Sequence, residues 1–105
     1  MNKILSLLSM CARAGKIKMG TDAVKEACVS GKAFGVYAAD DISQKSLKEA
    51  KFICQKTCVK LYSLGATMEE VGNQMGKRVG IIAVLDSGFN KKAASLALEI
   101  ATDKI

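Results

Sequence analysis

Basic side chains gather around a glycine turn in the first third of the chain. They are Arg13, Lys16, Lys18, Lys25 and Lys32. The turn, Gly20-Thr21, opens a predicted helix, and the N–H groups at a helix N-terminus favour anions such as phosphate. Lys25 follows Thr21 by one helical turn and so faces the same way. These residues predict an anion-binding site, although surface lysine also serves solubility alone.

A second basic pair, Lys77 and Arg78, follows a segment that contains glycines. With Gly72 and Gly76 before Lys77, this segment invites comparison with a phosphate-binding Walker A loop. That loop needs four residues between its glycines and a Ser or Thr after the lysine, whereas three residues intervene here and Arg78 follows. We interpret Gly72 as a close approach of its helix to the sheet, and Gly76 as a left-handed C-cap. Lys77 and Arg78 then remain as cations at a loop tip.

Catalytic and metal-binding chemistry has little support in the sequence. The chain has no histidine, which excludes Ser–His and Cys–His nucleophile pairs and imidazole zinc sites. Asp40 and Asp41 follow a predicted strand and could bind Mg²⁺ or exchange protons. Adjacent strand residues point to opposite faces, however, and we interpret the pair as part of a solvated loop. Asp86 is expected to cap the last helix or its turn. We therefore expect no enzymatic activity, no cofactor and no metal.

The four cysteines favour a reduced, buried state. They are Cys11, Cys28, Cys54 and Cys58, and they form no C-x-x-C pair. Each lies within or beside an apolar pattern, which predicts small buried side chains. The sequence shows no signal-peptide cleavage pattern, and its longest apolar stretch, residues 79–85, is far shorter than the roughly 20 residues of a membrane span. We therefore expect a cytoplasmic protein with no membrane partner.

Length and composition predict one globular domain. A chain of 105 residues makes a single domain, 1–105, since domains usually hold about 50–200 residues. Half of the residues are hydrophobic and a quarter are charged, as in ordinary globular proteins. The 16 Lys and Arg against 10 Asp and Glu give a net charge of +6, which favours an anionic partner such as nucleic acid.

Apolar periodicity predicts helices and strands in strict alternation. The expected helices span residues 2–14, run from Gly20-Thr21 to Gly31, begin at Ser43, run from Thr67 to Gly76, and span residues 90–103. The expected strands cover residues 16–19, residues 34–39, the region of Val59 and Leu61, and residues 79–85. Helices between strands act as crossovers, which predicts a three-layer α/β/α sandwich with a four-stranded, mixed, mostly parallel sheet. The short strand over 16–19 is expected at an edge, where it can run against the others.

Three groups of residues, in this order and at this spacing, carry a resemblance to a known family. The first is Ala14-Gly15-Lys16, then Gly20-Thr21, then the 34–39 strand that ends in Ala39-Asp40. Residues 70–77 are similar to an LG-x-x-x-GK segment with Val in place of Leu, and residues 86–92 to a D-x-GF-x-K tail. Together they resemble the L7Ae family of ribosomal proteins that bind kink-turn RNA, and its small bacterial members in particular. The resemblance covers nearly the whole chain.

The resemblance implies an α/β/α sandwich that binds structured RNA, ribosomal or other, and catalyses no reaction. Family members hold a sharply bent internal loop with sheared G·A pairs, through the turn after the first strand and the loop after the fourth helix. On this chain the expected RNA-binding residues are Lys16, Lys18, Gly20, Thr21, Asp22, Lys25, Gly76, Lys77, Arg78 and Val79. The lysines and the arginine would neutralise phosphates, and the Gly20-Thr21 amides would hold a phosphate or a base edge. Asp22 would contact a guanine, and Val79 an unstacked base.

Three positions depart from the archaeal pattern of the family, which is roughly G-x-N-E-x-x-K. Its Asn, Glu and Lys positions hold Asp22, Ala23 and Glu26 here. Asp22 can accept from a guanine edge but lacks amide donors, and Ala23 offers no side-chain hydrogen bond. Two alternatives stay open. One is a protein-interaction module on an RNA-bound assembly, with ribosomal or other RNA-bound proteins as its partners. The other is a nucleotide-binding domain of Rossmann-like ancestry, which the lack of a glycine-rich turn after the 34–39 strand disfavours.

Overall fold

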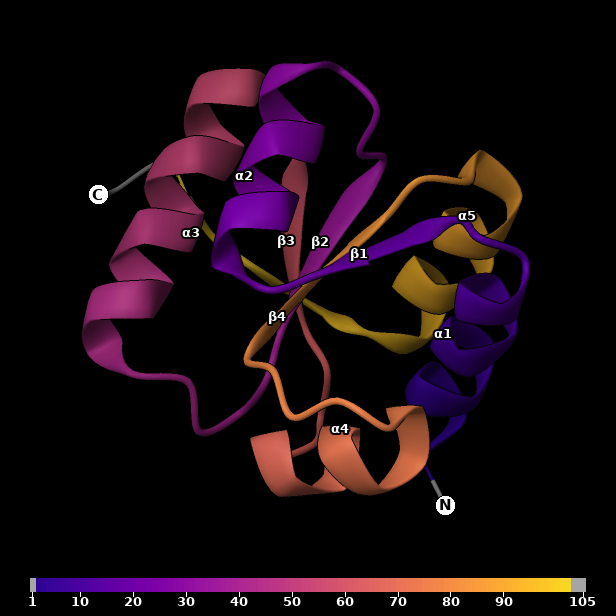
Figure 1. The fold of residues 1–105 in the computed structure, drawn as a ribbon. Helices are drawn as coiled ribbons and strands as arrows, with labels where there is room; N and C mark the ends of the chain where they lie inside the picture. Colours follow the sequence, from indigo (N-terminus) through magenta and orange to yellow (C-terminus); the bar gives the residue numbers. More distant parts are fainter. Residues whose placement is uncertain (1, 103–105) are drawn as a thin grey trace.

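Helices and strands alternate from end to end of the described chain (Figure 1). The computed structural model describes residues 2–102. Its helices are α1 (Lys3–Arg13), α2 (Thr21–Val29), α3 (Gln44–Thr57), α4 (Met68–Met75) and α5 (Ser87–Leu96). Its strands are β1 (Ile17–Met19), β2 (Gly35–Ala38), β3 (Lys60–Ser63), β4 (Ile81–Val84) and β5 (Leu98–Ile100). The predicted alternation is confirmed, with one strand more than expected.

The sheet lies between two helical layers, which confirms the predicted α/β/α sandwich. α2 and α3 cover one face and α1 and α5 the other, while α4 lies beyond the end of the sheet, against α1 (Figure 1). Successive strand residues point to opposite faces. Val36 and Ala38 therefore pack with α2 and α3, whereas Tyr37 between them packs on the side of α1 and α5. Because both faces are covered, β2 and β4 are buried along their whole length.

The sheet is mixed, as predicted, but one of the four strand pairs in its described part is parallel. The order is β1-β4-β2-β3-β5. β2 and β3 run parallel, and the other three pairs are antiparallel. The expectation of a mostly parallel sheet is wrong because it assumed that every helix crosses back over a face of the sheet. The eight-residue α4 lies beyond the end of the sheet instead, so β4 enters from the end where β3 finishes and runs the opposite way.

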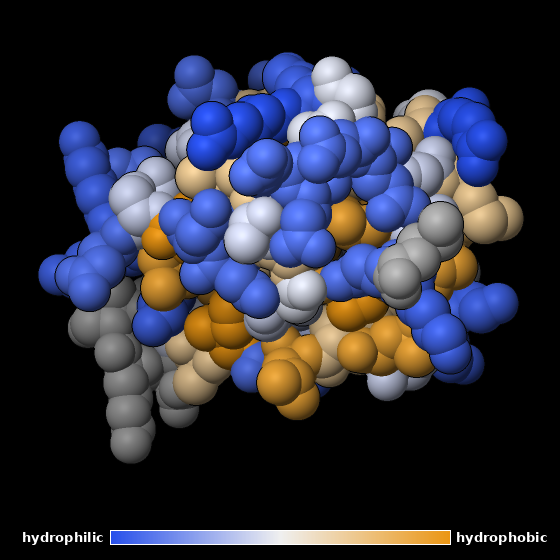
Figure 2. Space-filling model, turned by 90° about the horizontal axis from the view of Figure 1, so that it is seen from below, coloured by the Kyte–Doolittle hydropathy of each residue, from blue (hydrophilic) through white to orange (hydrophobic). Residues whose placement is uncertain are grey.

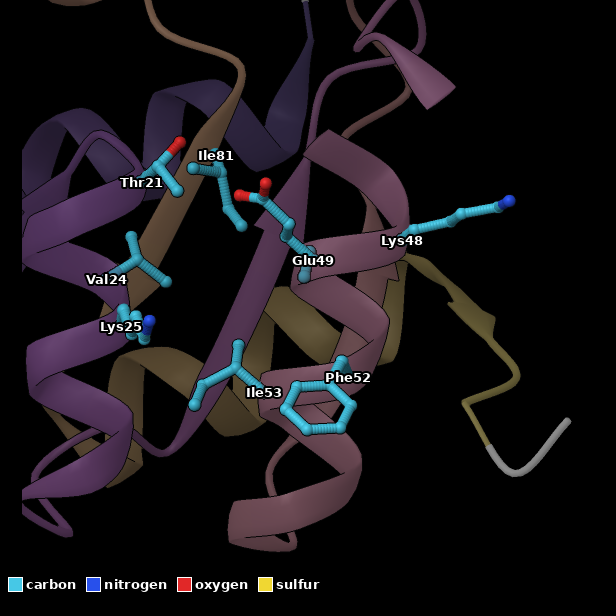
Figure 3. A pocket seen from close by; sticks show the side chains of 9 residues that line it. Thr21, Val24, Lys25, Lys48, Glu49, Phe52, Ile53 and Ile81 are labelled. Atoms are coloured by element: carbon cyan, nitrogen blue, oxygen red, sulfur yellow. The ribbon is translucent and has the colours of Figure 1, made fainter. Parts of the chain in front are cut away.

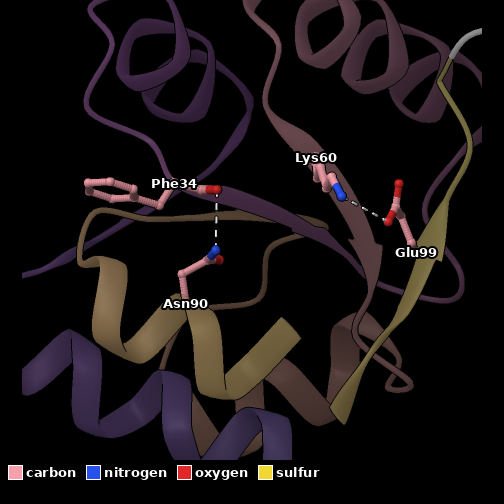
Figure 4. Close-up of polar contacts among 4 residues, drawn as sticks. All are labelled: Phe34, Lys60, Asn90 and Glu99. Carbon is pink, nitrogen blue, oxygen red and sulfur yellow. Dashed lines mark hydrogen bonds and ion pairs between the residues drawn. The ribbon is translucent and has the colours of Figure 1, made fainter. Parts of the chain in front are cut away.

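The last helix is shorter than expected and is followed by a strand. α5 ends at Leu96, whereas a helix over 90–103 was predicted; residue 103 itself lies outside the described residues. The next residues form β5, which pairs antiparallel with β3 and makes the sheet five-stranded rather than four-stranded. This pairing satisfies backbone groups that would otherwise lie open at the edge of β3. An ion pair spans the two strands, with Lys60 Nζ 3.7 Å from Glu99 Oε1 (Figure 4).

Side-chain caps lie at four helix starts, and at α1, α3 and α4 they confirm the sequence-based boundaries. Asn2 caps α1, Ser43 caps α3, Thr67 and Glu70 form the capping box of α4, and Asp86 caps α5. Each cap accepts a hydrogen bond from an N–H of the first turn, which has no partner within the helix. The start of α5 at Ser87, three residues earlier than predicted, follows from the cap at Asp86.

The α5 helix is attached to β2 through one asparagine. The Nδ2 of Asn90 donates to the carbonyl oxygen of Phe34 at 3.3 Å (Figure 4), and the hydroxyl of Tyr37 donates to Asn90 Oδ1 at 2.8 Å. The Asn90 side chain lies directly over Gly35, where a Cβ would overlap its Oδ1. Only glycine at position 35 therefore leaves room for this contact.

Three of the four cysteines confirm the expected burial. Cys11, Cys28 and Cys54 are buried, and burial raises the pKa of the Cys11 thiol above its usual value. Cys58 is exposed instead, and it ends α3 in the left-handed conformation with φ of 60°. Within residues 2–102, no helix is both long enough and apolar enough to cross a membrane.

Candidate nucleic-acid interface

A groove of about 300 Å³ lies at the end of the sheet where β1 passes into α2 and where β4 begins. We call it the loop groove. Three segments line it: the Gly20-Thr21 turn, the loop before α3 with the first turn of that helix, and the entry to β4. Met68 of α4 also contributes to the lining. The residues are Gly20, Thr21, Ile42, Ser43, Ser46, Met68, Val79, Gly80 and Ile81. Segments about 60 residues apart along the chain thus form one surface.

Two backbone hydrogen bonds fix the walls of the loop groove. The N–H of Gly20 donates to the carbonyl oxygen of Ile81 at 3.0 Å, and the N–H of Ala39 donates to that of Gly80 at 2.8 Å. The first bond ties the start of α2 to β4, and the second ties the end of β2 to the same strand. Both bonds join main-chain atoms at the end of the sheet. The backbone fold therefore positions the walls of the groove, and flexible side chains do not.

The start of α2 offers backbone donors to a ligand. Its N-cap is Gly20, with φ of 100° and ψ of 155°, and glycine has no side chain that could accept from the first turn. The conformation itself is one that is essentially restricted to glycine. The N–H groups of the first turn are therefore available to an outside acceptor, and the helix dipole favours a negatively charged one.

The loop between α4 and β4 carries the cations of this surface. Gly76 ends α4 with φ of 80°, as the predicted left-handed C-cap requires, and Lys77 and Arg78 follow with exposed side chains. A Cβ at Gly72 would lie 3.3 Å from the Cβ of Arg78, so glycine there lets the loop fold back against α4. The close approach predicted for Gly72 is thus to this loop rather than to the sheet.

The structure brings together part of the expected site. Gly20, Thr21 and Val79 line the loop groove, and the 76–78 segment adjoins it along the chain. Asp22 lies exposed in the first turn of α2. These residues all belong to the two segments that the sequence singled out.

Three expected lysines lie elsewhere. Lys25 lines a neighbouring groove between α2 and α3, and Lys18 lines a separate hollow on another side of α2, together with Lys32. Lys16 precedes β1, four residues before Gly20, which places the two about 13 Å apart along an extended strand. Lys16 and Lys18 thus lie outside the loop groove.

Six lining residues were not identified from the sequence. They are Ile42, Ser43, Ser46, Met68, Gly80 and Ile81. Ser43 was recognised as a helix cap, but its place beside Val79 depends on β4 lying next to β2 in the sheet. That strand order follows from long-range pairing between strands, which a local sequence pattern does not predict. The two serines supply hydroxyls, and Ile42 and Met68 supply apolar surface.

Asp40 and Asp41 position loops. Asp40 Oδ1 accepts from the Ser63 hydroxyl at 2.9 Å, and Asp41 Oδ1 accepts from the Met68 N–H at 2.8 Å. Both side chains are exposed, as the solvated-loop interpretation predicted, yet each holds a specific contact. In residues 2–102, no group of three or more His, Cys, Asp or Glu is arranged to hold a metal ion.

The chemistry of this end of the molecule suits a ligand that is both anionic and partly apolar. Seen from below, from the end that carries α4, the surface is largely hydrophilic, but hydrophobic side chains reach it between the polar ones (Figure 2). Backbone N–H donors and cations can hold phosphate, and exposed apolar edges can contact a flat ring. Nucleotides in a folded RNA present both kinds of group.

Comparison with known proteins defines the class of this protein. The sequence profile of the ribosomal protein L7Ae/L30e/S12e/Gadd45 family matches residues 2–94, and the chain belongs to that family. The resemblance read from the sequence motifs is therefore confirmed. Among its relatives, the RNA-binding protein YlxQ of Enterococcus faecium is 28% identical over 97 residues, which cover 90% of each chain. A solved structure, described as a protein with unknown function from Bacillus halodurans C, matches with a TM-score of 0.84 and 29% identity, over 91% of this chain and 97% of that one.

Proposed function

We propose that this protein binds structured RNA of the kink-turn type through the loop groove and the two segments that border it. One observation carries the proposal: the start of α2, with no side-chain cap, lies beside the entry to β4, to which it is hydrogen-bonded from Gly20 to Ile81. Backbone donors, the Lys77–Arg78 tip and an apolar wall thus share one end of a chain whose net charge is +6. The E. faecium relative, named as an RNA-binding protein, supports the same function.

The division of roles follows from the chemistry of each group. Lys77 and Arg78 neutralise phosphates at the loop tip, and the Gly20-Thr21 amides bind a phosphate or a base edge. Asp22 accepts from the N–H edge of a guanine, and Val79 packs against an unstacked base. The protein acts in the cytoplasm, with its RNA and RNA-bound proteins as partners, and catalyses no reaction.

A pair of RNAs tests the proposal. One contains a kink-turn with its sheared G·A pairs; the other has the same length and sequence except that Watson–Crick pairs replace the G·A pairs. We expect the protein to bind the first RNA at least tenfold more tightly in a fluorescence anisotropy titration at fixed salt, because only that RNA adopts the bend. Equal affinity for both would contradict recognition of the bend. No binding of either, together with capture of a protein partner that survives nuclease, would indicate a protein-interaction module instead.

A further inference from the structure

A second groove, of about 500 Å³, lies between α2 and α3 and adjoins the loop groove. We call it the helix groove. Thr21 and Ile81 line both grooves, so the surface is continuous from one to the other. Its volume is within the range of pockets that hold small molecules, and its lining is mostly apolar, with Val24 and Ile53 facing each other from the two helices (Figure 3).

An exposed aromatic ring stands at the mouth of the helix groove. Phe52 on α3 is 56% exposed, whereas the next residue, Ile53, is buried. Its ring stands beside Ile53, on the side of α3 that faces α2 (Figure 3). Lys56, one turn later on α3, has its Nζ 6.0 Å from the centre of the ring. A ring in this position can stack on another flat ring while the nearby ammonium group meets a negative charge.

The charges around the helix groove favour an anionic occupant. Lys25 lines it from α2, and α3 carries four lysines against one acidic residue, Glu49. The side chain of Lys48 points away from the groove, toward solvent (Figure 3). This flexible side chain can reach the phosphates of a nucleic-acid strand that passes over α3. Glu49 points instead across the groove, toward Thr21 and Ile81 (Figure 3). A carboxylate there accepts hydrogen bonds and cannot donate them.

We propose that the helix groove holds one unpaired guanine nucleotide of the RNA that occupies the loop groove. The base stacks on Phe52, and its Watson–Crick edge presents two neighbouring N–H donors to the carboxylate of Glu49. Lys25 and Lys56 neutralise the phosphates on either side of this nucleotide. The inference rests on the proposed function, because the RNA strand reaches this groove from the loop groove across Thr21 and Ile81.

Five RNAs test this inference. One is a kink-turn RNA without an extension; the other four are the same RNA with a short single-stranded extension of guanines or of uridines on one strand or on the other. For the native protein we expect one guanine extension to raise the affinity roughly tenfold over the RNA without extension, and uridines to raise it less. Phe52→Ala should abolish the gain and Phe52→Tyr should keep it, while both variants bind the RNA without extension as the native protein does. Glu49→Gln should reduce the preference for guanine over uridine.

Phe34→Ala is the matched control, because Phe34 is similarly exposed (52% against 56%) but lies outside both grooves. It should keep the full gain. The inference is overturned if neither extension raises the affinity of the native protein, or if Phe52→Ala keeps the gain. A loss of protein capture in Phe52→Ala, with RNA binding unchanged, would make the groove a protein-docking surface. Failure of the native protein to bind even the RNA without extension would instead overturn the proposed function itself.

Discussion

The backbone N–H of Gly20 donates to the carbonyl oxygen of Ile81 at 3.0 Å, and this bond couples the start of α2 to the entry of β4. Gly20 adopts φ of 100° and ψ of 155°, which a residue with a Cβ adopts only under strain. We expect Gly20→Ala to lower the free energy of unfolding by about 1–3 kcal/mol and to weaken RNA binding, since relief of the strain moves the turn away from Ile81. Urea denaturation and RNA titration measure the two effects.

Gly31→Ala provides the comparison for that variant. Gly31 also has positive φ, 75°, but it lies after α2, at the opposite end of the helix from the loop groove. We expect it to lose stability as well, by about 1 kcal/mol, while its RNA affinity stays native. If both variants lost RNA affinity in proportion to stability, the Gly20 turn would have no specific part in binding.

The cations of the α4–β4 loop give a prediction that depends on salt. Replacing Lys77 and Arg78 together by Ala should weaken RNA binding roughly tenfold and reduce the slope of log affinity against log salt by about one to two. The reason is that binding releases fewer counterions from the RNA when two phosphate contacts are missing. Titrations at several salt concentrations between roughly 50 and 200 mM measure the slope.

The double variant Lys91→Ala, Lys92→Ala removes the same charge from another part of the surface. Both lysines are exposed on α5, which packs on the opposite face of the sheet from α2. We expect its salt slope to remain close to the native one. A similar change of slope in both double variants would mean that binding senses net charge alone and that Lys77 and Arg78 have no special place in it.

The sequence predicted elements and their ends more successfully than their arrangement. Caps such as Ser43 and Asp86 act within one turn, so local residues are sufficient to identify them. The direction of β4 depends instead on the position of α4. The sequence of α4 does not indicate that this helix packs beyond the end of the sheet. Near the end of the described chain, Leu96 and Ile100 fit a helical spacing, whereas Leu98 and Ile100 fit an alternating one, and pairing with β3 decides between them.

The sequence predicted the part of the loop-groove lining that is continuous along the chain, but not the part that neighbouring strands bring to it. Gly20 and Val79 were found because glycine turns and basic loop tips are local signals, to which the family motifs added order. Ile42 and Ser46 belong to the same groove because β2 lies between β4 and β3. Lys18 was included for its proximity in sequence, but it lies on another side of α2. Spacing alone does not reveal on which side of α2 a strand residue lies.

The contact between Tyr37 and Asn90 predicts a stability effect remote from the RNA surface. The Tyr37 hydroxyl, on a fully buried side chain, donates to Asn90 Oδ1 at 2.8 Å. Asn90→Ala leaves the hydroxyl without this acceptor, and we expect the free energy of unfolding to fall by about 1–3 kcal/mol. Tyr37→Phe should then cost less in the Asn90→Ala background than in the native one, since the hydroxyl there keeps only its longer contact, 3.4 Å in the native protein, with the backbone carbonyl oxygen of residue 90. Additive losses in a urea-denaturation cycle would show that the two side chains are not coupled.

Burial of Tyr37 also predicts a loss of stability in alkaline solution. Burial, with a smaller contribution from Tyr62, raises the pKa of Tyr37 above its ordinary value of 10.0. The folded state therefore keeps a proton that the unfolded state releases, so the contribution is fully present below about pH 10 and is lost as the pH rises beyond it. Tyr37 should steepen the fall of the free energy of unfolding by up to about 1.4 kcal/mol per pH unit in that range. Tyr37→Phe should remove this part of the slope between pH 9 and pH 11, roughly the range in which an unfolded tyrosine ionises. Equal slopes for the native protein and the variant would mean that Tyr37 ionises as easily in the folded chain as in the unfolded one.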